Sequence, residues 1–176
     1  LLHNETEAEK VRTLQIVKRN ADRLIRLVNQ ILDLRKIERG YEQLRIQQYN
    51  IVKFCEQIFN DFSKQAMQRK INLQFKAENT PVLLWFDLDK IEKVIINLMS
   101  NAMKYTPENG QITVSINHEQ ITKENNNDKH KYLVIKIKDT GVGIPKEQHK
   151  LIFERFTSVK TEKFNKQQGT GIGLSL

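Results

Sequence analysis

Apolar residues recur at alternating spacings of three and four from Val11 onward, a pattern typical of a helix that packs against other helices. The seam consists of Leu14, Val17, Ala21, Leu24, Val28 and Ile31. Further apolar residues between Ile16 and Leu34 widen the stripe, so more than one neighbouring helix is expected. We therefore predict one long bundle helix that stops near Gly40 and needs a partner helix from an upstream segment, a second chain or both.

After Gly40 the pattern changes to short strands and helices. Leu44 and Ile46 alternate with polar residues and predict a short strand, and Asn50 is a candidate N-cap for the helix that follows. The expected elements are strands over residues 71–75, 82–86, 112–116 and 133–137, and helices over 51–62 and from Asp87 or Asp89 to about Pro107.

Strands with one apolar and one polar face suggest a largely antiparallel sheet that carries helices on a single side. The polar stretch over residues 123–131 is interpreted as a hairpin loop. The fold class is therefore predicted to be α+β, a two-layer α/β sandwich preceded by one long helix. Residues 1–40 would form the helical part, and residues 41–176 the α/β domain.

Composition limits the class of protein. With 176 residues, of which 39% are hydrophobic, the chain can form one domain of ordinary size plus an appendage. A single cysteine, Cys55, excludes an internal disulfide and fits a reducing compartment. No apolar run reaches the roughly 18 residues of a membrane span. The first ten residues lack the features of a signal peptide, so we expect the sequence to begin inside a longer chain.

The formal net charge of +8 favours polyanionic partners such as nucleic acid, a membrane surface or a phosphorylated small molecule. The basic residues are nevertheless spread along the chain and interleaved with acidic ones. No compact basic block or aromatic interleaving of the kind that stacks bases accompanies them. We interpret the charge mainly as a solvated surface, and a nucleic-acid-binding protein is an alternative that rests on charge alone.

The first segment that suggests chemistry runs from Asn97 to Pro107. Asn97, Asn101 and Lys104 are spaced i, i+4 and i+7, so they share one stripe of a helix. Amide oxygens are hard ligands of the kind that Mg²⁺ prefers, and an ammonium group can meet phosphate. The alternative is an ordinary polar helix face.

Two glycine-containing segments follow. Asp139, Gly141 and Gly143 come directly after a strand, where a carboxylate can accept a hydrogen bond from an amine and glycines allow close backbone approach. Gly169, Gly171 and Gly173 have a spacing that suits backbone N–H groups around phosphate oxygens, although the segment matches neither the P-loop nor the dinucleotide fingerprint. Plain turns are the alternative for both.

The order of these segments, with Phe153-Glu154-Arg155-Phe156 between the second and third, resembles the ATP-binding domain of sensor histidine kinases. They correspond to the N box, the first glycine box, the F box and the second glycine box of that family. Upstream, the stretch VNQILDLRKIERG is similar to the second helix of the dimerisation and phosphotransfer hairpin. The resemblance covers nearly the whole chain, and it implies the Bergerat-type (GHKL) ATPase fold shared with gyrase, MutL and heat-shock chaperones. On this resemblance the last strand or strands of the fold lie beyond Leu176.

The resemblance implies a role for each matching residue, with ATP and Mg²⁺ as the bound groups. Asn101 would bind Mg²⁺ with Asn97 beside it, Lys104 would meet phosphate, and these three would be the catalytic residues. Asp139 would receive the adenine amino group. The remaining nucleotide contacts would be Tyr105, Gly141, Gly143, Ile144, Phe156, Lys160, Gly169, Thr170, Gly171, Gly173 and Leu174, with Arg155 as a further candidate. Residues from about 156 to 168 would form a mobile ATP lid.

One position separates kinases from the hydrolysing members of this fold, which carry a Glu four residues before the metal-binding Asn. Here that position is Asn97, whose amide cannot take a proton from water. ATP would thus not be hydrolysed and would remain available to a better nucleophile, a neutral histidine imidazole. Catalysis would then rest on positioning and on charge neutralisation by Mg²⁺ and Lys104.

The phosphoacceptor motif of the family, His-Glu-x-x-Arg-Thr-Pro, does not occur in this sequence. Its four histidines are His3, His118, His130 and His149, which we place in a turn, a strand end, a loop and a short helix. The resemblance therefore implies the cytoplasmic part of a sensor kinase that is anchored in the inner membrane through upstream segments. Its partners would be ATP, a second kinase subunit joined through the bundle helix, and a response-regulator receiver domain, without nucleic acid. A catalytically silent module of the same fold is the alternative.

Overall fold

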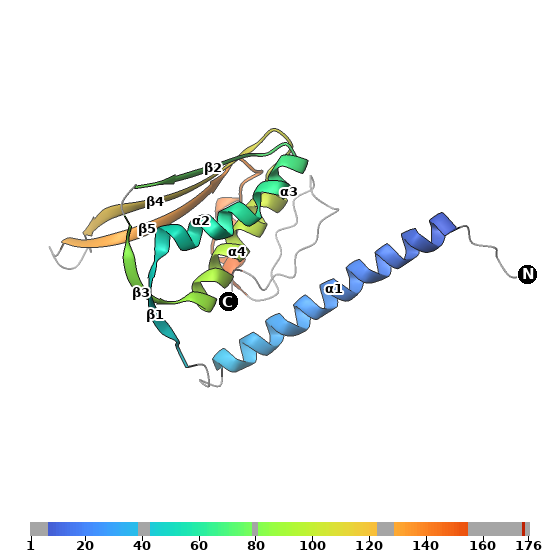
Figure 1. Ribbon diagram of the computed structural model, residues 1–176, viewed down its shortest axis with the longest axis horizontal. Helices are drawn as coiled ribbons and strands as arrows, with labels where there is room; N and C mark the ends of the chain where they lie inside the picture. Colours follow the sequence, from blue (N-terminus) through green and yellow to red (C-terminus); the bar gives the residue numbers. More distant parts are fainter. Residues whose placement is uncertain (1–6, 39–42, 79–80, 123–128, 155–173, 175–176) are drawn as a thin grey trace, which may run out of the picture.

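The computed structural model describes residues 7–38, 43–78, 81–122, 129–154 and Leu174. Helix α1 spans Glu7–Glu38 and lies outside the two layers formed by the other elements (Figure 1). The part of its apolar seam whose side chains are described is open to solvent, because Leu14, Leu24 and Val28 are all more than half exposed. None of the helices in the described ranges is both long enough and apolar enough to cross a membrane.

The rest of the described chain alternates short strands and helices. In chain order the elements are β1 (Ile46–Asn50), α2 (Ile51–Asp61), α3 (Ser63–Gln68), β2 (Asn72–Ala77), β3 (Leu83–Asp87), α4 (Leu88–Tyr105), β4 (Gln111–Thr122) and β5 (Lys129–Asp139). Two short 3₁₀ turns, Lys146–Gln148 and Leu151–Phe153, follow β5.

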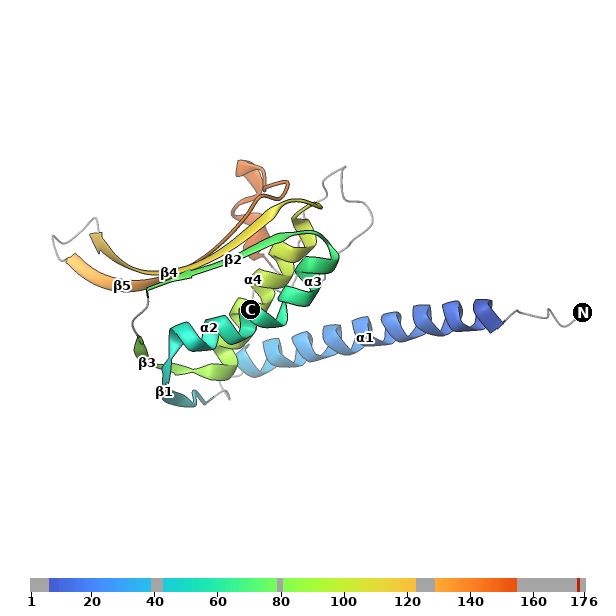
Figure 2. The same ribbon diagram turned by 45° about the horizontal axis from the view of Figure 1, so that its top comes forward.

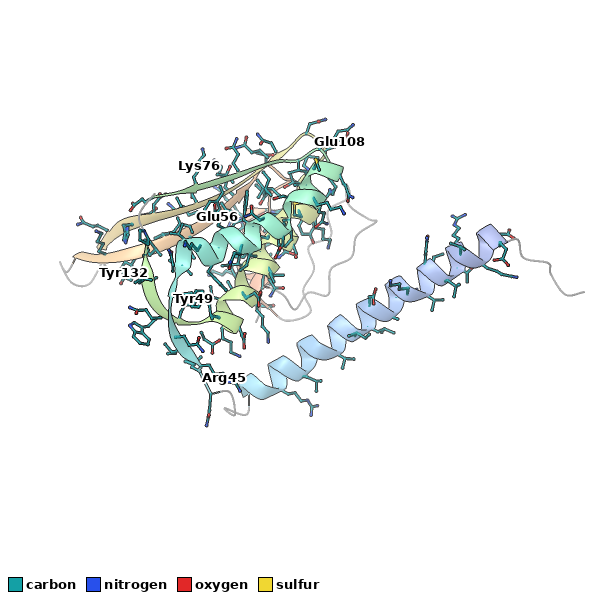
Figure 3. All side chains as sticks on the ribbon, in the orientation of Figure 1. Arg45, Tyr49, Glu56, Lys76, Glu108 and Tyr132 are labelled. Carbon is teal, nitrogen blue, oxygen red and sulfur yellow. The ribbon has the colours of Figure 1, made fainter. Side chains whose placement is uncertain are left out.

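The described strands form two sheets. The larger has the order β2-β4-β5, in which β2 and β4 are parallel and β4 and β5 are antiparallel. β1 and β3 form a separate antiparallel ribbon. Helices α2, α3 and α4 cover one face of the larger sheet (Figure 2). The expected α+β sandwich with helices on one face is confirmed, and the sheet, expected to be largely antiparallel, is mixed.

The core lies between the helices and β4. Ile112, Val114 and Ile116 alternate along β4 and are at most 2% exposed, as expected for the inner face of a half-buried strand. Met99 and Met103 of α4 pack over them and are equally buried. Burial of each such side chain contributes about 1.5–3 kcal/mol, so this layer fixes α4 on the sheet.

Two polar side chains begin the helices of this layer. Asn50 Oδ1 accepts hydrogen bonds from the N–H groups of Val52 (3.1 Å) and Lys53 (3.4 Å) at the start of α2. Asp87 Oδ1 accepts from the Lys90 N–H (3.2 Å) at the start of α4, and its Oδ2 accepts from the Arg45 N–H (2.8 Å). Asn50 is the predicted N-cap, and of the two expected starts of the second helix, Asp87 is the one that caps it. The hydrogen bond from Arg45 lowers the pKa of the Asp87 carboxyl more than its burial raises it.

The structure corrects several predicted boundaries, and β4 and β5 are longer than the strands expected over 112–116 and 133–137. The first strand runs from Ile46 to Asn50, further along the chain than expected, because it pairs with β3 over that length. The predicted helix over 51–62 ends at Asp61, and the separate helix α3 follows it. His130 lies in β5 opposite Ile121 and not in a loop.

Candidate nucleotide-binding site

One polar stripe of α4 faces away from the core. At about 100° per residue, Asn97, Asn101 and Lys104 lie within roughly 60° of one another. They are half-buried, whereas Met99 and Met103 on the other side of the helix are fully buried. The helix is fixed by its N-cap and by its core contacts. The amide groups of Asn97 and Asn101 and the ammonium group of Lys104 therefore lie in line along it.

Lys104 and Tyr105 contact each other at the end of α4. Lys104 Nζ donates a hydrogen bond to Tyr105 Oη at 3.0 Å and lies 4.6 Å from the centroid of its ring. The attraction between an ammonium group and an aromatic face adds to this hydrogen bond. The Lys104 charge is therefore held at the end of the stripe.

The segment after β5 returns to the end of α4. Asp139 is the last residue of β5, and its exposed carboxylate accepts a hydrogen bond from the Gly141 N–H on Oδ1 (2.8 Å). A Cβ atom on Gly141 would lie 2.7 Å from the Tyr105 carbonyl oxygen, so no side chain fits there. Gly143 has φ +70° with open space around it, so there the backbone conformation favours glycine. The loop of Asp139 and the end of α4 are therefore in close contact.

Thr140 and Gly110 hold this contact, and the sequence analysis did not single them out. The Thr140 N–H donates to the Gln111 carbonyl oxygen (3.0 Å), and the Gln111 N–H donates to Thr140 Oγ1 (2.9 Å). A Cβ atom on Gly110 would lie 2.5 Å from Thr106 Cγ2. Gly110 could have been identified from the dipeptide Asn109-Gly110, which is typical of a tight turn.

The remaining predicted site residues are divided between described and undescribed segments. Ile144 is exposed, and its carbonyl oxygen lies 3.0 Å from His149 Nε2; Leu174 is half-buried in a turn. Arg155, Phe156, Lys160, Gly169, Thr170, Gly171 and Gly173 lie outside the described residues, as does the predicted lid over 156–168.

The donors that the described site offers to a metal are amide oxygens. No group of three or more His, Cys, Asp or Glu side chains in the described ranges could hold a metal ion. Asn97 and Asn101 alone would leave most coordination positions of Mg²⁺ to other oxygens. Mg²⁺ commonly keeps waters and substrate phosphates as ligands, so this donor set fits an ion that arrives with a polyphosphate.

Comparison with known families decides the class of the domain. The sequence profile of the histidine kinase-, DNA gyrase B- and HSP90-like ATPases matches residues 86–176. The chain belongs to this ATPase family. The match begins just before α4 and includes all three motif segments, so the ATP-binding domain expected from the sequence is confirmed.

Curated relatives of this ATPase domain are histidine kinases. Histidine kinase P4 of Formosa agariphila is 36% identical over 166 residues, which cover 93% of this chain and 11% of that protein. Sensor histidine kinase WalK of Bacillus subtilis is 34% identical over 168 residues, 94% of this chain and 26% of that protein. The chain thus spans only a small part of the length of these relatives.

Solved structures support the same fold. The catalytic domain of histidine kinase ThkA, in a nucleotide-free form, has a TM-score of 0.59 at 27% identity and covers 74% of this chain and 76% of that chain. Full-length ShkA in complex with AMPPNP has a TM-score of 0.75 and covers 98% of this chain and 33% of that chain. At 21% identity, the second match concerns the fold alone.

Proposed function

We propose that this chain binds ATP and, within a longer sensor histidine kinase, supplies the γ-phosphoryl group to a histidine. One observation carries the proposal: the tight contact of Gly141 with the Tyr105 carbonyl brings the exposed Asp139 carboxylate next to the helix that carries Asn97, Asn101 and Lys104. We infer that this carboxylate and the row of amide and ammonium groups bind one ligand from two elements. Such a site suits a molecule with an amine at one end and phosphates at the other.

Each side chain has a distinct proposed role. Asp139 accepts a hydrogen bond from the adenine amino group, and Gly141 and Gly143 shape the backbone around the base. Lys104 meets phosphate oxygens, with Tyr105 packed beside the nucleotide. Asn101 and Asn97 hold Mg²⁺, which when bound neutralises phosphate charge.

Residues outside the described ranges complete the proposed site. We assign Phe156 and Lys160 to the lid, with Arg155 as a further phosphate contact. The backbone around Gly169, Thr170, Gly171 and Gly173 would close over the phosphates, with Ile144 and Leu174 as further nucleotide contacts. The spacing of these glycines supports this assignment.

Asn97 favours transfer to histidine over hydrolysis, because its amide cannot act as a general base toward water. A neutral imidazole needs no such base: its nitrogen lone pair forms the bond to the γ-phosphorus as the bond to the β,γ-bridging oxygen breaks and ADP leaves. The phosphoryl group would then pass to an aspartate of a response regulator. ThkA has been crystallised in complex with the response regulator protein TrrA, which supports this kind of partner.

Residues 1–40 are proposed to contribute the second helix of the dimerisation hairpin, and residues 41–176 the catalytic domain. The exposed seam of α1 supports this, because more than half of the Leu14, Leu24 and Val28 surfaces would otherwise face water. A second subunit would cover it. We place the chain in the cytoplasm as part of a membrane-anchored kinase.

The test is incubation of the full-length protein with ATP labelled in its γ-phosphate. We expect a label that is lost in acid and retained in base, since phosphohistidine hydrolyses once the imidazole is protonated. Asp139→Ala should abolish the labelling. An acid-stable label would indicate a serine or threonine kinase, and Mg-ATP binding without any labelling would favour the silent module.

A further inference from the structure

We propose that Arg69 is a positioning residue that sets the spacing between the phosphate end of the nucleotide site and its adenine end. The inference rests on the proposed function, since it concerns the same site. The hydrogen bonds that Arg69 donates go to backbone carbonyl oxygens and not to the side chains of the nucleotide site. It acts on the backbone that carries them.

Arg69 reaches the last turn of α4 from the end of α3. Its Nη1 donates to the Met103 carbonyl oxygen, and its Nη2 donates to the Thr106 carbonyl oxygen at 3.0 Å. The last carbonyls of a helix have no partner within the helix, and a cation there also interacts favourably with the helix dipole. Lys104 and Tyr105 lie between the two bonded carbonyls. Arg69 itself lies outside residues 86–176, which the family profile matches.

The turn that carries Arg69 is also joined to the turn after α4. The Asn109 N–H donates to the Lys70 carbonyl oxygen at 3.0 Å, and the Asn72 N–H donates to the Gly110 carbonyl oxygen at 2.8 Å. Lys70 Nζ and Glu108 Oε1 form an ion pair at 2.6 Å. Of the side chains that join these two turns, that of Arg69 is half-buried, and its guanidinium group bridges two backbone carbonyls.

The same end of α4 also contacts the loop of Asp139. Gly141 packs against the Tyr105 carbonyl, and Thr140 exchanges two hydrogen bonds with Gln111. The backbone from Met103 to Gln111 is therefore fixed by Arg69 and by the Asp139 loop together. If the bonds from Arg69 are removed, this backbone can shift relative to β5, and the spacing between Lys104 and Asp139 is no longer set.

This predicts a selective effect on ligands that span the site. Adenosine needs only the adenine end, whereas Mg-ADP needs both ends at the correct spacing. We expect Arg69→Met to weaken Mg-ADP binding about tenfold, the effect of losing roughly one charge-assisted hydrogen bond, and to change adenosine binding less than about twofold. A lysine cannot bond two carbonyls as a planar guanidinium does, so Arg69→Lys should fall between wild type and Arg69→Met.

The experiment measures dissociation constants for Mg-ADP by calorimetry and for adenosine by NMR titration, on chains shown to be folded by circular dichroism. Glu108→Gln is the matched control, because it breaks the ion pair of the same turn without touching the α4 carbonyls, and it should behave as wild type. If Arg69→Met does not fold, Arg69→Lys decides. Equal losses for both ligands would show a merely structural role, and unchanged Mg-ADP affinity would also overturn the proposal. Failure of the wild type to bind either ligand would instead contradict the proposed function.

Discussion

At the scale of single residues, we propose that adenine recognition depends on the Asp139 side chain. Its Oδ1 already holds the loop through the Gly141 N–H, and its carboxylate is exposed. Asp139→Asn keeps an acceptor for Gly141 but removes the charge. We expect Mg-ADP affinity to fall ten- to a hundredfold, since a hydrogen bond to a charged group contributes roughly 1.5–3 kcal/mol. Calorimetry that finds wild-type affinity in a folded Asp139→Asn chain would show that the adenine pocket lies elsewhere.

Asn101 should control the part of binding that depends on magnesium. Asn101→Ala removes one hard oxygen ligand and leaves the helix, whose buried side is formed by Met99 and Met103, in place. In the wild type we expect EDTA to weaken ADP binding, and in the variant we expect EDTA to have little further effect. Equal sensitivity to EDTA in both chains would contradict the metal assignment.

Cys55 offers a check on the core. The thiol is 1% exposed, and burial raises its pKa to about 11. Because the thiolate is the reactive form, Cys55 should resist a thiol reagent at pH 8 in the folded chain and react after denaturation. Rapid labelling without denaturant would show that α2 does not pack as described.

At the scale of elements, the start of α4 should depend on pH. The pKa of Asp87 is lowered in the folded chain, chiefly by the Arg45 N–H, so ionised Asp87 stabilises the fold at every pH above its ordinary, unfolded pKa. That stability is lost as the pH falls through the lower folded pKa. Chemical denaturation should show a larger difference in the free energy of unfolding between wild type and Asp87→Asn at pH 7 than at pH 3. The same difference at both values would contradict the ionised cap.

Elements with local signals were predictable from the sequence, and contacts between distant segments were not. Asn50 and Asp87 cap helices by accepting hydrogen bonds from backbone N–H groups two or three positions away, so their roles could be inferred from neighbouring residues in the sequence. The β1–β3 ribbon joins segments some forty residues apart through backbone bonds that leave no motif. Arg69 likewise bonds carbonyl oxygens, which every residue carries. Candidate site residues could be proposed from the sequence because glycine and asparagine spacing is local, whereas the contact between the Asp139 loop and the end of α4 depends on tertiary structure.

At the scale of the whole molecule, α1 should govern self-association. Leu24 is 62% exposed in the seam, so a carboxylate there would be buried in any helix–helix interface. We expect the chain to dimerise weakly and Leu24→Asp to be monomeric with unchanged Mg-ADP affinity. Gln15→Asp adds the same charge on the opposite side of the helix and should leave dimerisation intact. Sedimentation that shows a monomeric wild type at high concentration would contradict the proposed role of α1.

We propose above all that this basic chain binds an adenine nucleotide and not nucleic acid. The most direct test is calorimetric titration of the 176-residue chain with Mg-ADP and, separately, with random duplex DNA at physiological salt. We predict saturable binding of one Mg-ADP per chain and no saturable binding of DNA. Saturable binding of DNA without any binding of Mg-ADP would contradict the account.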